Sequence, residues 1–217
     1  MLAIPAQAQV ELVTDGGFDD PTTAAWILQA YDTSTIAWDS QDAAENSSSG
    51  SLLLQKKVGE NPNSLRASQC IEVVPGGEYS LSGTAFWPTT SDQGELYLVV
   101  SWLLGPQCTG SPGDPNGADL IIGSPPRDVW TPIGPQVVAA PAGVHSVRLY
   151  VGVVAYVNLG SPAIFEARWD DVSFVPEPGP AAGAAVIAAL VALVQRRRRA
   201  RAGGLSAQHR VSVARMT

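Results

Sequence analysis

The sequence predicts an all-β fold, an antiparallel β-sandwich, followed by one hydrophobic helix near the C-terminal end. Two observations support the sandwich: strand-like runs recur between turn-forming residues, and no segment has the spacing of an amphipathic helix. Clusters of Gly, Pro, Asn and Asp separate these runs. The expected strands cover residues 51–56, 68–74, 78–87, 95–104, 130–139, 145–157 and 164–174.

Two of the runs alternate cleanly between apolar and polar residues, as a half-buried strand does. In 78–87 one face carries Tyr79, Leu81, Gly83, Ala85 and Trp87, and the other carries Ser80, Ser82, Thr84 and Phe86. In 145–153 one face carries Val147, Leu149, Val151 and Val153, and the other carries Ser146, Arg148 and Tyr150. Sheets with one buried and one wet face are antiparallel and pack in pairs. Residues 105–128, rich in proline and glycine, are expected to form a long loop.

The C-terminal region has the composition of a membrane segment with a basic end. Residues 179–194 are 16 apolar or small residues without a charge, and Arg196, Arg197, Arg198 and Arg199 follow almost at once. As a helix the run would span roughly 24 Å, slightly less than the hydrocarbon core. The arginines predict a cytoplasmic C-terminus. The alternative is a buried core helix, which the arginine cluster disfavours.

Charge divides the chain at the same point. All 20 acidic residues lie at or before Glu177 with only six basic residues, which gives that part a net charge of −14. The remainder carries seven arginines and no acid. An acidic body lacks the cations that neutralise phosphates, so nucleic acid is not expected as a partner.

The sequence Val-Pro-Glu-Pro at 175–178, a short apolar helix and an arginine cluster together resemble the PEP-CTERM sorting signal of Gram-negative bacteria. The resemblance implies export and transient retention in the inner membrane through residues 179–194. It also implies recognition at Pro176, Glu177 and Pro178 by an exosortase-type processing enzyme, then delivery to the cell surface or extracellular matrix. The signal would occupy residues 175–201, and residues 202–217 would form a disordered tail.

The N-terminal residues 1–8 end in Ala6-Gln7-Ala8, the small-x-small pattern of a signal-peptidase site. We interpret them as the remnant of a signal peptide, with an ordinary disordered N-terminus as the alternative. The only two cysteines, Cys70 and Cys108, favour a disulfide in an oxidising compartment. Two free buried thiols are the alternative.

The body, residues 9–174, is expected to be one domain. Its segments Asp15-Gly-Gly-Phe-Asp19, Pro75-Gly-Gly-Glu-Tyr-Ser-Leu-Ser82 and Trp169-Asp-Asp-Val172, with Trp26 and Trp130 between them, resemble carbohydrate-binding modules of the CenC type. The resemblance implies a jelly-roll sandwich that binds polysaccharide. It also implies one structural Ca²⁺, with Asp19, Asp170 and Asp171 as candidate ligands; solvated acidic residues at strand ends are the alternative. Trp26, Trp130 and Trp169 lie in the fold pattern and are expected in the core.

Sugar recognition uses aromatic faces together with polar groups. Strand parity places several such side chains opposite the apolar stripes, and one more, Trp38, lies in a polar, loop-like stretch. The candidate ligand-binding residues are therefore Trp38, Phe86, Tyr97, Arg148 and Tyr150.

Catalysis has little support in the sequence, because neither of the two histidines has a nucleophile or metal-ligand partner at a suitable spacing. We therefore expect a non-catalytic, polysaccharide-binding module. Two alternatives stay open: a structural or adhesive matrix protein without a sugar site, and a glycoside-acting enzyme that uses a carboxylate pair.

Overall fold

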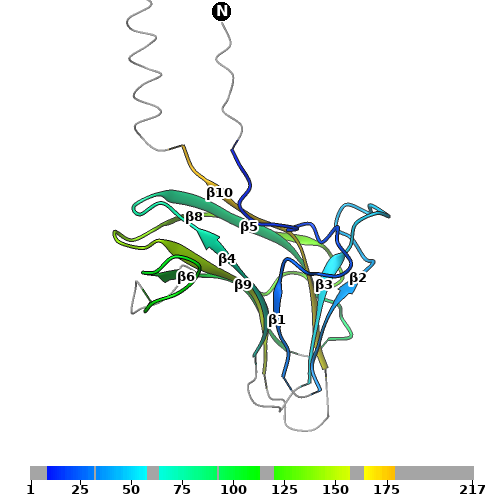
Figure 1. The fold of residues 1–217 in the computed structure, drawn as a ribbon. Coiled ribbons are helices and arrows are strands. Elements are labelled where there is room, and N and C mark those ends of the chain that lie inside the picture. Colours follow the sequence, from blue (N-terminus) through cyan, green and yellow to red (C-terminus); the bar gives the residue numbers. More distant parts are fainter. Residues whose placement is uncertain are drawn as a thin grey trace, which may run out of the picture. The chain divides into compact units, whose positions relative to one another are not determined.

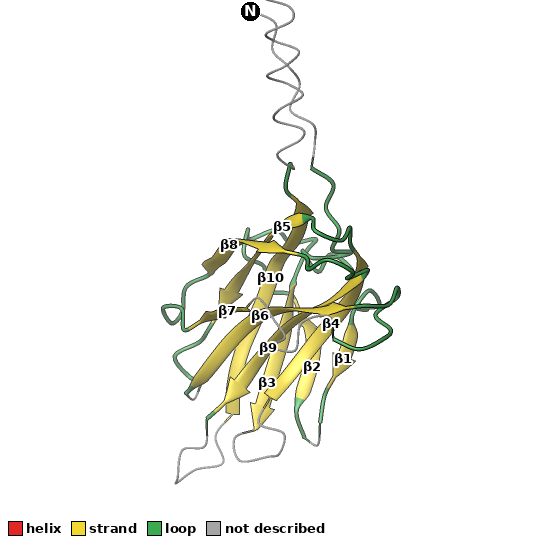
Figure 2. Cartoon of the chain, turned by 90° about the vertical axis from the view of Figure 1, so that its left-hand side faces the viewer, coloured by secondary structure: helices red, strands yellow, loops and turns green. Residues whose placement is uncertain are grey.

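The computed structural model describes residues 9–31, 33–57, 64–91, 93–112, 120–156 and 164–178, and strands are the regular structure of these ranges (Figure 2). Ten strands form two antiparallel sheets (Figure 1). The first sheet has the order β1 (Ile27–Gln29), β4 (Ser64–Glu72), β9 (Ser146–Ala155), β6 (Gly94–Leu103) and β7 (Leu120–Gly123). The second has the order β2 (Thr35–Asp39), β3 (Ser51–Lys57), β10 (Ile164–Pro176), β5 (Glu78–Phe86) and β8 (Thr131–Ala139).

The core lies between the inner faces of the two sheets, and sequence alternation decides which side chains enter it. On β5 the predicted apolar face is buried, while Ser80, Ser82, Thr84 and Phe86 lie on the outer face. On β9 the same holds for the four predicted core residues from Val147 to Val153. The predicted all-β two-sheet sandwich is confirmed.

Each of the seven predicted strands corresponds to an observed one, and the differences lie in short or edge strands. The expected loop at 105–128 contains β7, which pairs with β6 at the edge of the first sheet. The short strands β1 and β2 were also not predicted from the sequence. Both lie at sheet edges, where one neighbour supplies all of the backbone pairing and the side-chain pattern is weak.

Two tryptophans differ from expectation. Trp38 is in strand β2 rather than in a loop; its indole N–H donates to the Phe18 carbonyl at 2.9 Å, and its ring packs against the core. Trp130, expected in the core, is half-buried and contacts Phe86 on the outer face of the second sheet. Trp26 and Trp169 are buried as predicted.

The first and the last described residues of the sandwich lie side by side. The amide of Leu12 donates to the Phe174 carbonyl at 3.2 Å, and Gln9 donates to the Pro176 carbonyl at 3.3 Å. Strand β10 extends to Pro176, and the amide of Glu177 still donates to the Glu78 carbonyl at 2.8 Å. The proposed sorting motif therefore begins inside the last strand.

Several sequence predictions fall outside the described residues: the signal-peptide remnant at 1–8, the apolar run at 179–194, the arginine cluster and the tail at 202–217. The chain divides into a unit of residues 1–177 and a unit of residues 178–217, and all described residues except Pro178 lie in the first. Within the ranges given above, no helix has the length and apolar character needed to cross a membrane.

Candidate functional site

The outer face of the first sheet gathers most of the predicted ligand-binding residues. On β9, Arg148, Tyr150 and Gly152 lie on the outer face of the sheet. The residues that alternate with them, from Val147 to Val153, are buried in the core. The register aligns Gly152 with Tyr97 of β6 on one side and with Arg66 of β4 on the other.

The same row continues to Gln29 of β1, which pairs with Arg66. We call the set made of Gln29, Arg66, Tyr97, Arg148 and Tyr150 the tyrosine face. Three of its five members were predicted from strand parity. Arg66 and Gln29 were missed because the predicted strand began at residue 68, whereas β4 begins at Ser64, and because β1 was not predicted.

Tyr97 lies flat across the sheet because the residue beneath it is a glycine. A Cβ added at Gly152 would come within 2.3 Å of the Tyr97 ring carbon Cζ and 2.6 Å of the Leu65 carbonyl oxygen. The Tyr97 hydroxyl reaches 3.5 Å from that carbonyl. Burial raises the pKa of Tyr97 to about 12, although the nearby Arg66 charge lowers it. Its hydroxyl is therefore a neutral donor throughout the physiological pH range.

Replacing Gly152 with alanine is expected to displace the Tyr97 ring and to lower stability by about 1–3 kcal/mol through overpacking. The carbonyl oxygen of Leu65 belongs to the backbone of β4, so it cannot move away without displacing the strand. Urea unfolding measures the stability change. Gly17→Ala is the matched control, because an added Cβ there meets only an Asp19 carboxylate oxygen at 3.9 Å. Equal stability of the two variants would contradict the packing described for Tyr97.

Next to Tyr97, a second flat surface is formed by Arg66 and Tyr150. The Arg66 guanidinium carbon lies 4.6 Å from the centroid of the Tyr150 ring, within the range of a cation–π contact. The Nε of Arg66 donates to the Gln29 side-chain oxygen at 2.5 Å. Stacking and hydrogen bonding together fix the guanidinium plane, which leaves oriented N–H donors beside two aromatic rings.

A disulfide-bonded loop borders one end of the tyrosine face. Cys70 of β4 is bonded to Cys108, which confirms the predicted disulfide. The amide of Cys108 donates to the Ser146 hydroxyl oxygen at 3.0 Å, and that hydroxyl donates to the Gly105 carbonyl at 2.6 Å. Arg148 donates to the Cys108 carbonyl at 3.4 Å. The loop is therefore held beside Arg148.

The other two predicted ligand-binding residues lie elsewhere. Phe86 is on the outer face of the second sheet, on the opposite side of the sandwich, where it meets Trp130. Trp38 packs against the core, as described above. The tyrosine face is thus built without them.

The aspartates proposed for calcium differ in their surroundings. Asp19 and Asp171 are exposed, whereas Asp170 is buried, and its two oxygens accept the amides of Ala43 at 2.8 Å and Asp171 at 2.7 Å. In the part of the chain that the structure describes, no three acidic, histidine or cysteine side chains form a group suited to a metal ion. Calcium at these three residues stays a prediction.

Asp170 should make stability depend on pH. Burial raises its pKa to about 6, against the lowering effect of the two amide hydrogen bonds. Because the pKa in the unfolded chain is about 3.9, the folded state binds the proton more tightly, and this contribution to stability falls as pH rises from about 4 to about 6.

Lowering the pH from 7 to about 4.5 is therefore expected to stabilise the wild type relative to Asp170→Asn by about 2 kcal/mol. Urea unfolding at both pH values measures the difference. The exposed Asp19→Asn serves as control. A difference between wild type and Asp170→Asn that does not change with pH would contradict the assignment.

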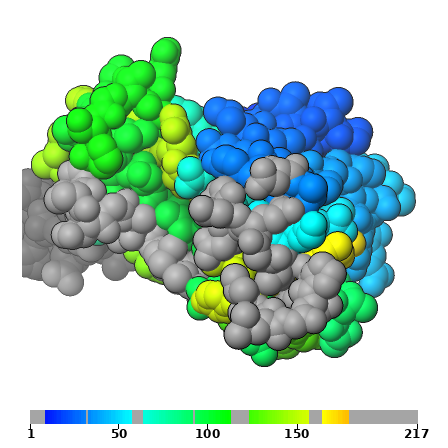
Figure 3. All heavy atoms as spheres, turned by 90° about the horizontal axis from the view of Figure 1, so that it is seen from below, coloured from blue at the N-terminus to red at the C-terminus, as the bar shows by residue number. Residues whose placement is uncertain are grey.

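The surface of the molecule seen from below is shared by distant parts of the sequence. Residues from the N-terminal part of the chain (blue) and from its middle (green) occupy separate regions of this surface (Figure 3). This surface is thus built from segments that lie far apart in the sequence.

Comparison with known proteins identifies the fold. No protein-family profile matches the sequence, and no curated protein matches it. Among solved structures, the C-terminal family 22 carbohydrate-binding module of Clostridium thermocellum Xyn10B is similar with a TM-score of 0.52 at 13% identity, over 74% of this chain and 90% of that one. The CBM22-1 xylan-binding domain of Paenibacillus barcinonensis Xyn10C gives a TM-score of 0.51 at 14% identity, over 80% of this chain and 99% of that one.

The enzymatically active domain of bacteriophage CBA120 tailspike protein 4 gives a TM-score of 0.55 at 16% identity. That match covers 77% of this chain but only 21% of the tailspike domain, so this chain spans about a fifth of it. At such low identity the likeness concerns the fold alone. The described part of the chain has the jelly-roll β-sandwich fold of carbohydrate-binding modules.

Proposed function

We propose that the protein is a non-catalytic module that binds polysaccharide on the tyrosine face. The observation that carries the proposal is the pair of flat surfaces there, Tyr97 seated on Gly152 and Arg66 stacked on Tyr150. Aromatic rings stack on the apolar faces of pyranose units, and oriented polar groups bond the hydroxyls.

The polar groups of the tyrosine face suit a sugar chain. Gln29, Arg66 and Arg148 supply side-chain N–H donors, and the hydroxyl groups of Tyr97 and Tyr150 can donate and accept. They come from three neighbouring strands and from edge strand β1, so the site extends across the sheet. An extended surface of this kind fits a polymer better than a single small molecule.

Retention of the full chain on immobilised polysaccharides tests the proposal. Xylan belongs in the panel because two of the similar structures come from xylan-binding proteins, together with other neutral plant and bacterial polysaccharides. We expect at least one polysaccharide to retain the protein. No retention on any of them would overturn the proposal and favour a structural or adhesive matrix protein.

We further propose that the module is exported and sorted through its C-terminal signal. The motif Pro176-Glu177-Pro178 lies where the last strand ends, at the boundary between the two units of the chain. The disulfide between Cys70 and Cys108 suits an oxidising compartment. An exosortase-type enzyme would process the protein after transient retention in the inner membrane, before delivery to the surface or extracellular matrix of a Gram-negative cell.

Mass spectrometry of the mature protein tests this route. We expect a chain that starts near Gln9 and ends close to the motif. A mature chain that keeps Arg196 to Arg199 would contradict processing at this site.

A further inference from the structure

The outer face of the second sheet carries an aromatic pair on the opposite side of the sandwich from the tyrosine face. Phe86 ends β5, and Trp130 lies directly before β8; their ring centroids are 5.4 Å apart at an interplanar angle of 48°. Both side chains are half-buried. Tilted rings in contact hold each other in place, so together they offer a fixed apolar surface to solvent.

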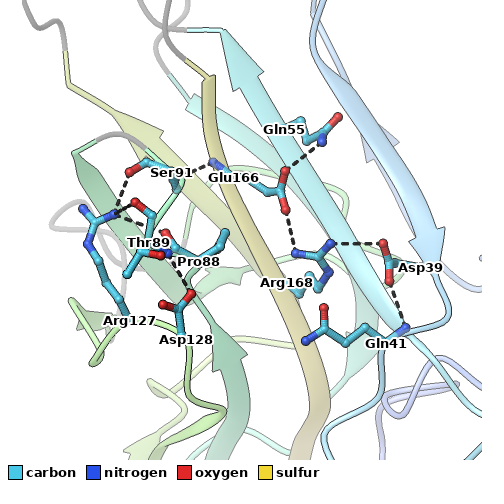
Figure 4. A network of polar contacts seen from close by, with 10 residues as sticks. All are labelled: Asp39, Gln41, Gln55, Pro88, Thr89, Ser91, Arg127, Asp128, Glu166 and Arg168. Atoms are coloured by element: carbon cyan, nitrogen blue, oxygen red, sulfur yellow. Dashed lines mark hydrogen bonds and ion pairs between the residues drawn. The ribbon is translucent and has the colours of Figure 1, made fainter.

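A charged group lies directly beside this pair. Arg168 of β10 is paired in register with Phe86, and its guanidinium carbon lies 5.8 Å from the Phe86 ring centroid. The guanidinium donates to Glu166 at 2.7 Å and to Asp39 at 3.2 Å, so β10 and β2 both contribute (Figure 4). The side chain of Arg168 is 13% exposed, and two carboxylates hold it in one orientation.

The two carboxylates keep acceptor capacity that the fold does not use. The second oxygen of Glu166 accepts the Gln55 amide at 2.9 Å, and the second oxygen of Asp39 accepts the Gln41 backbone amide at 2.8 Å. An ionised carboxylate can accept about four hydrogen bonds in all. Their side chains are 23% and 25% exposed, so the free lone pairs reach solvent.

A braced loop borders the aromatic pair. Arg127 donates to the carbonyl groups of Pro88 at 3.2 Å and Ser91 at 2.6 Å, and it stacks on Trp87 with 4.2 Å between guanidinium carbon and ring centroid. The hydroxyl of Ser91 accepts the backbone amide of Glu166 at 2.8 Å. Residues 88–91 are thereby fixed against β10, and Figure 4 shows this border on one side of Glu166 and Arg168 with Asp39 on the other.

We propose that this surface, defined by Asp39, Phe86, Trp130, Glu166 and Arg168, is a second carbohydrate-binding site that takes a neutral sugar unit. Rings and acceptors lie side by side, as a ligand with an apolar face and several hydroxyl donors requires. Two carboxylates and one guanidinium give the surface a net charge of −1, which disfavours acidic sugars and phosphates. A chain with one site on each sheet can join two polysaccharide strands.

The second site is separable from the tyrosine face because the two lie on different sheets. Substitutions on one face therefore leave the other unchanged. Failure of the tyrosine-face proposal and failure of this one give different results in the same set of variants.

The experiment measures binding of the full chain to soluble neutral polysaccharides, among them xylan, galactan and β-glucan, by affinity gel electrophoresis. We expect Trp130→Ala to weaken binding to at least one of them about tenfold. Asp39→Asn removes a carboxylate while keeping the size of the side chain, and we expect it to have a similar effect. The matched control is Val137→Ala, an exposed side chain on β8 that has no place in the site. Tyr97→Ala/Tyr150→Ala is expected to leave this contribution intact.

Two results would overturn the proposal. In the first, Trp130→Ala and Asp39→Asn bind every polysaccharide that the wild type binds with the same affinity as Val137→Ala, while circular dichroism shows that all variants are folded. The other is complete loss of binding to every polysaccharide in Tyr97→Ala/Tyr150→Ala, which would leave the second sheet no binding of its own.

Discussion

Replacing Trp169 with alanine is expected to lower the free energy of unfolding by about 4 kcal/mol. Trp169 is fully buried on the central strand β10, where its ring lies beneath Gly83 of β5, 3.5 Å from a Cβ added there. Its indole N–H crosses to the first sheet and donates to the Gly152 carbonyl at 3.3 Å. Truncation would leave a cavity between the sheets and remove the hydrogen bond below Tyr97.

Equilibrium unfolding in urea measures this loss, which is a large part of the 5–15 kcal/mol typical of a folded domain. Trp130→Ala is the matched control, because the same side chain is removed from a half-buried position on the outer face. We expect it to cost less than half as much. Equal losses in the two variants would contradict the assignment of Trp169 to the core.

The second large effect is expected from the disulfide. The bond between Cys70 and Cys108 closes a loop with a sequence separation of 38 residues, for which the chain-entropy estimate is about 4 kcal/mol. The variant Cys70→Ser/Cys108→Ser should therefore unfold at a much lower urea concentration than the oxidised wild type. Reduction of the wild type should produce the same shift, whereas the variant should not respond to reductant.

The loss also reaches the tyrosine face. Without the bond, the loop at 104–112 keeps its hydrogen bonds to Glu72, Ser146 and Arg148 but no covalent link to the first sheet. We expect weaker polysaccharide binding in addition to lower stability. Unchanged unfolding midpoints of the reduced and oxidised wild type would show that the disulfide does not stabilise the fold.

Alternation predicted the sandwich well because a strand buried on one face shows this in its own residues. The apolar stripes of β5 and β9 are examples, and the even number of cysteines pointed to the disulfide. The calcium ligands inferred from resemblance stay a prediction; the structure shows that Asp170 accepts hydrogen bonds from the amides of Ala43 and Asp171. A motif indicates residue types, whereas the hydrogen-bond partners of Asp170 follow from the fold.

Register and contacts between strands are what the sequence did not reveal. Nothing near Tyr97 in the chain indicates that Gly152 lies under its ring, because β6 and β9 are about 50 residues apart and only their pairing brings the two together. Arg66 was overlooked for a related reason: its strand begins with a polar residue, Ser64. Trp130 precedes an edge strand, where parity does not show which face a side chain takes.

The central claim is that the tyrosine face binds polysaccharide, and the most direct test is the dissociation constant of the full chain for the polysaccharide that retains it best. Wild type is compared with Tyr97→Ala/Tyr150→Ala and with Val74→Ala, an exposed apolar side chain just beyond β4. We predict at least a tenfold weaker affinity for the double variant, a loss of about 1.4 kcal/mol or more, and no change for Val74→Ala. Equal affinity of all three proteins, each folded, would contradict the claim.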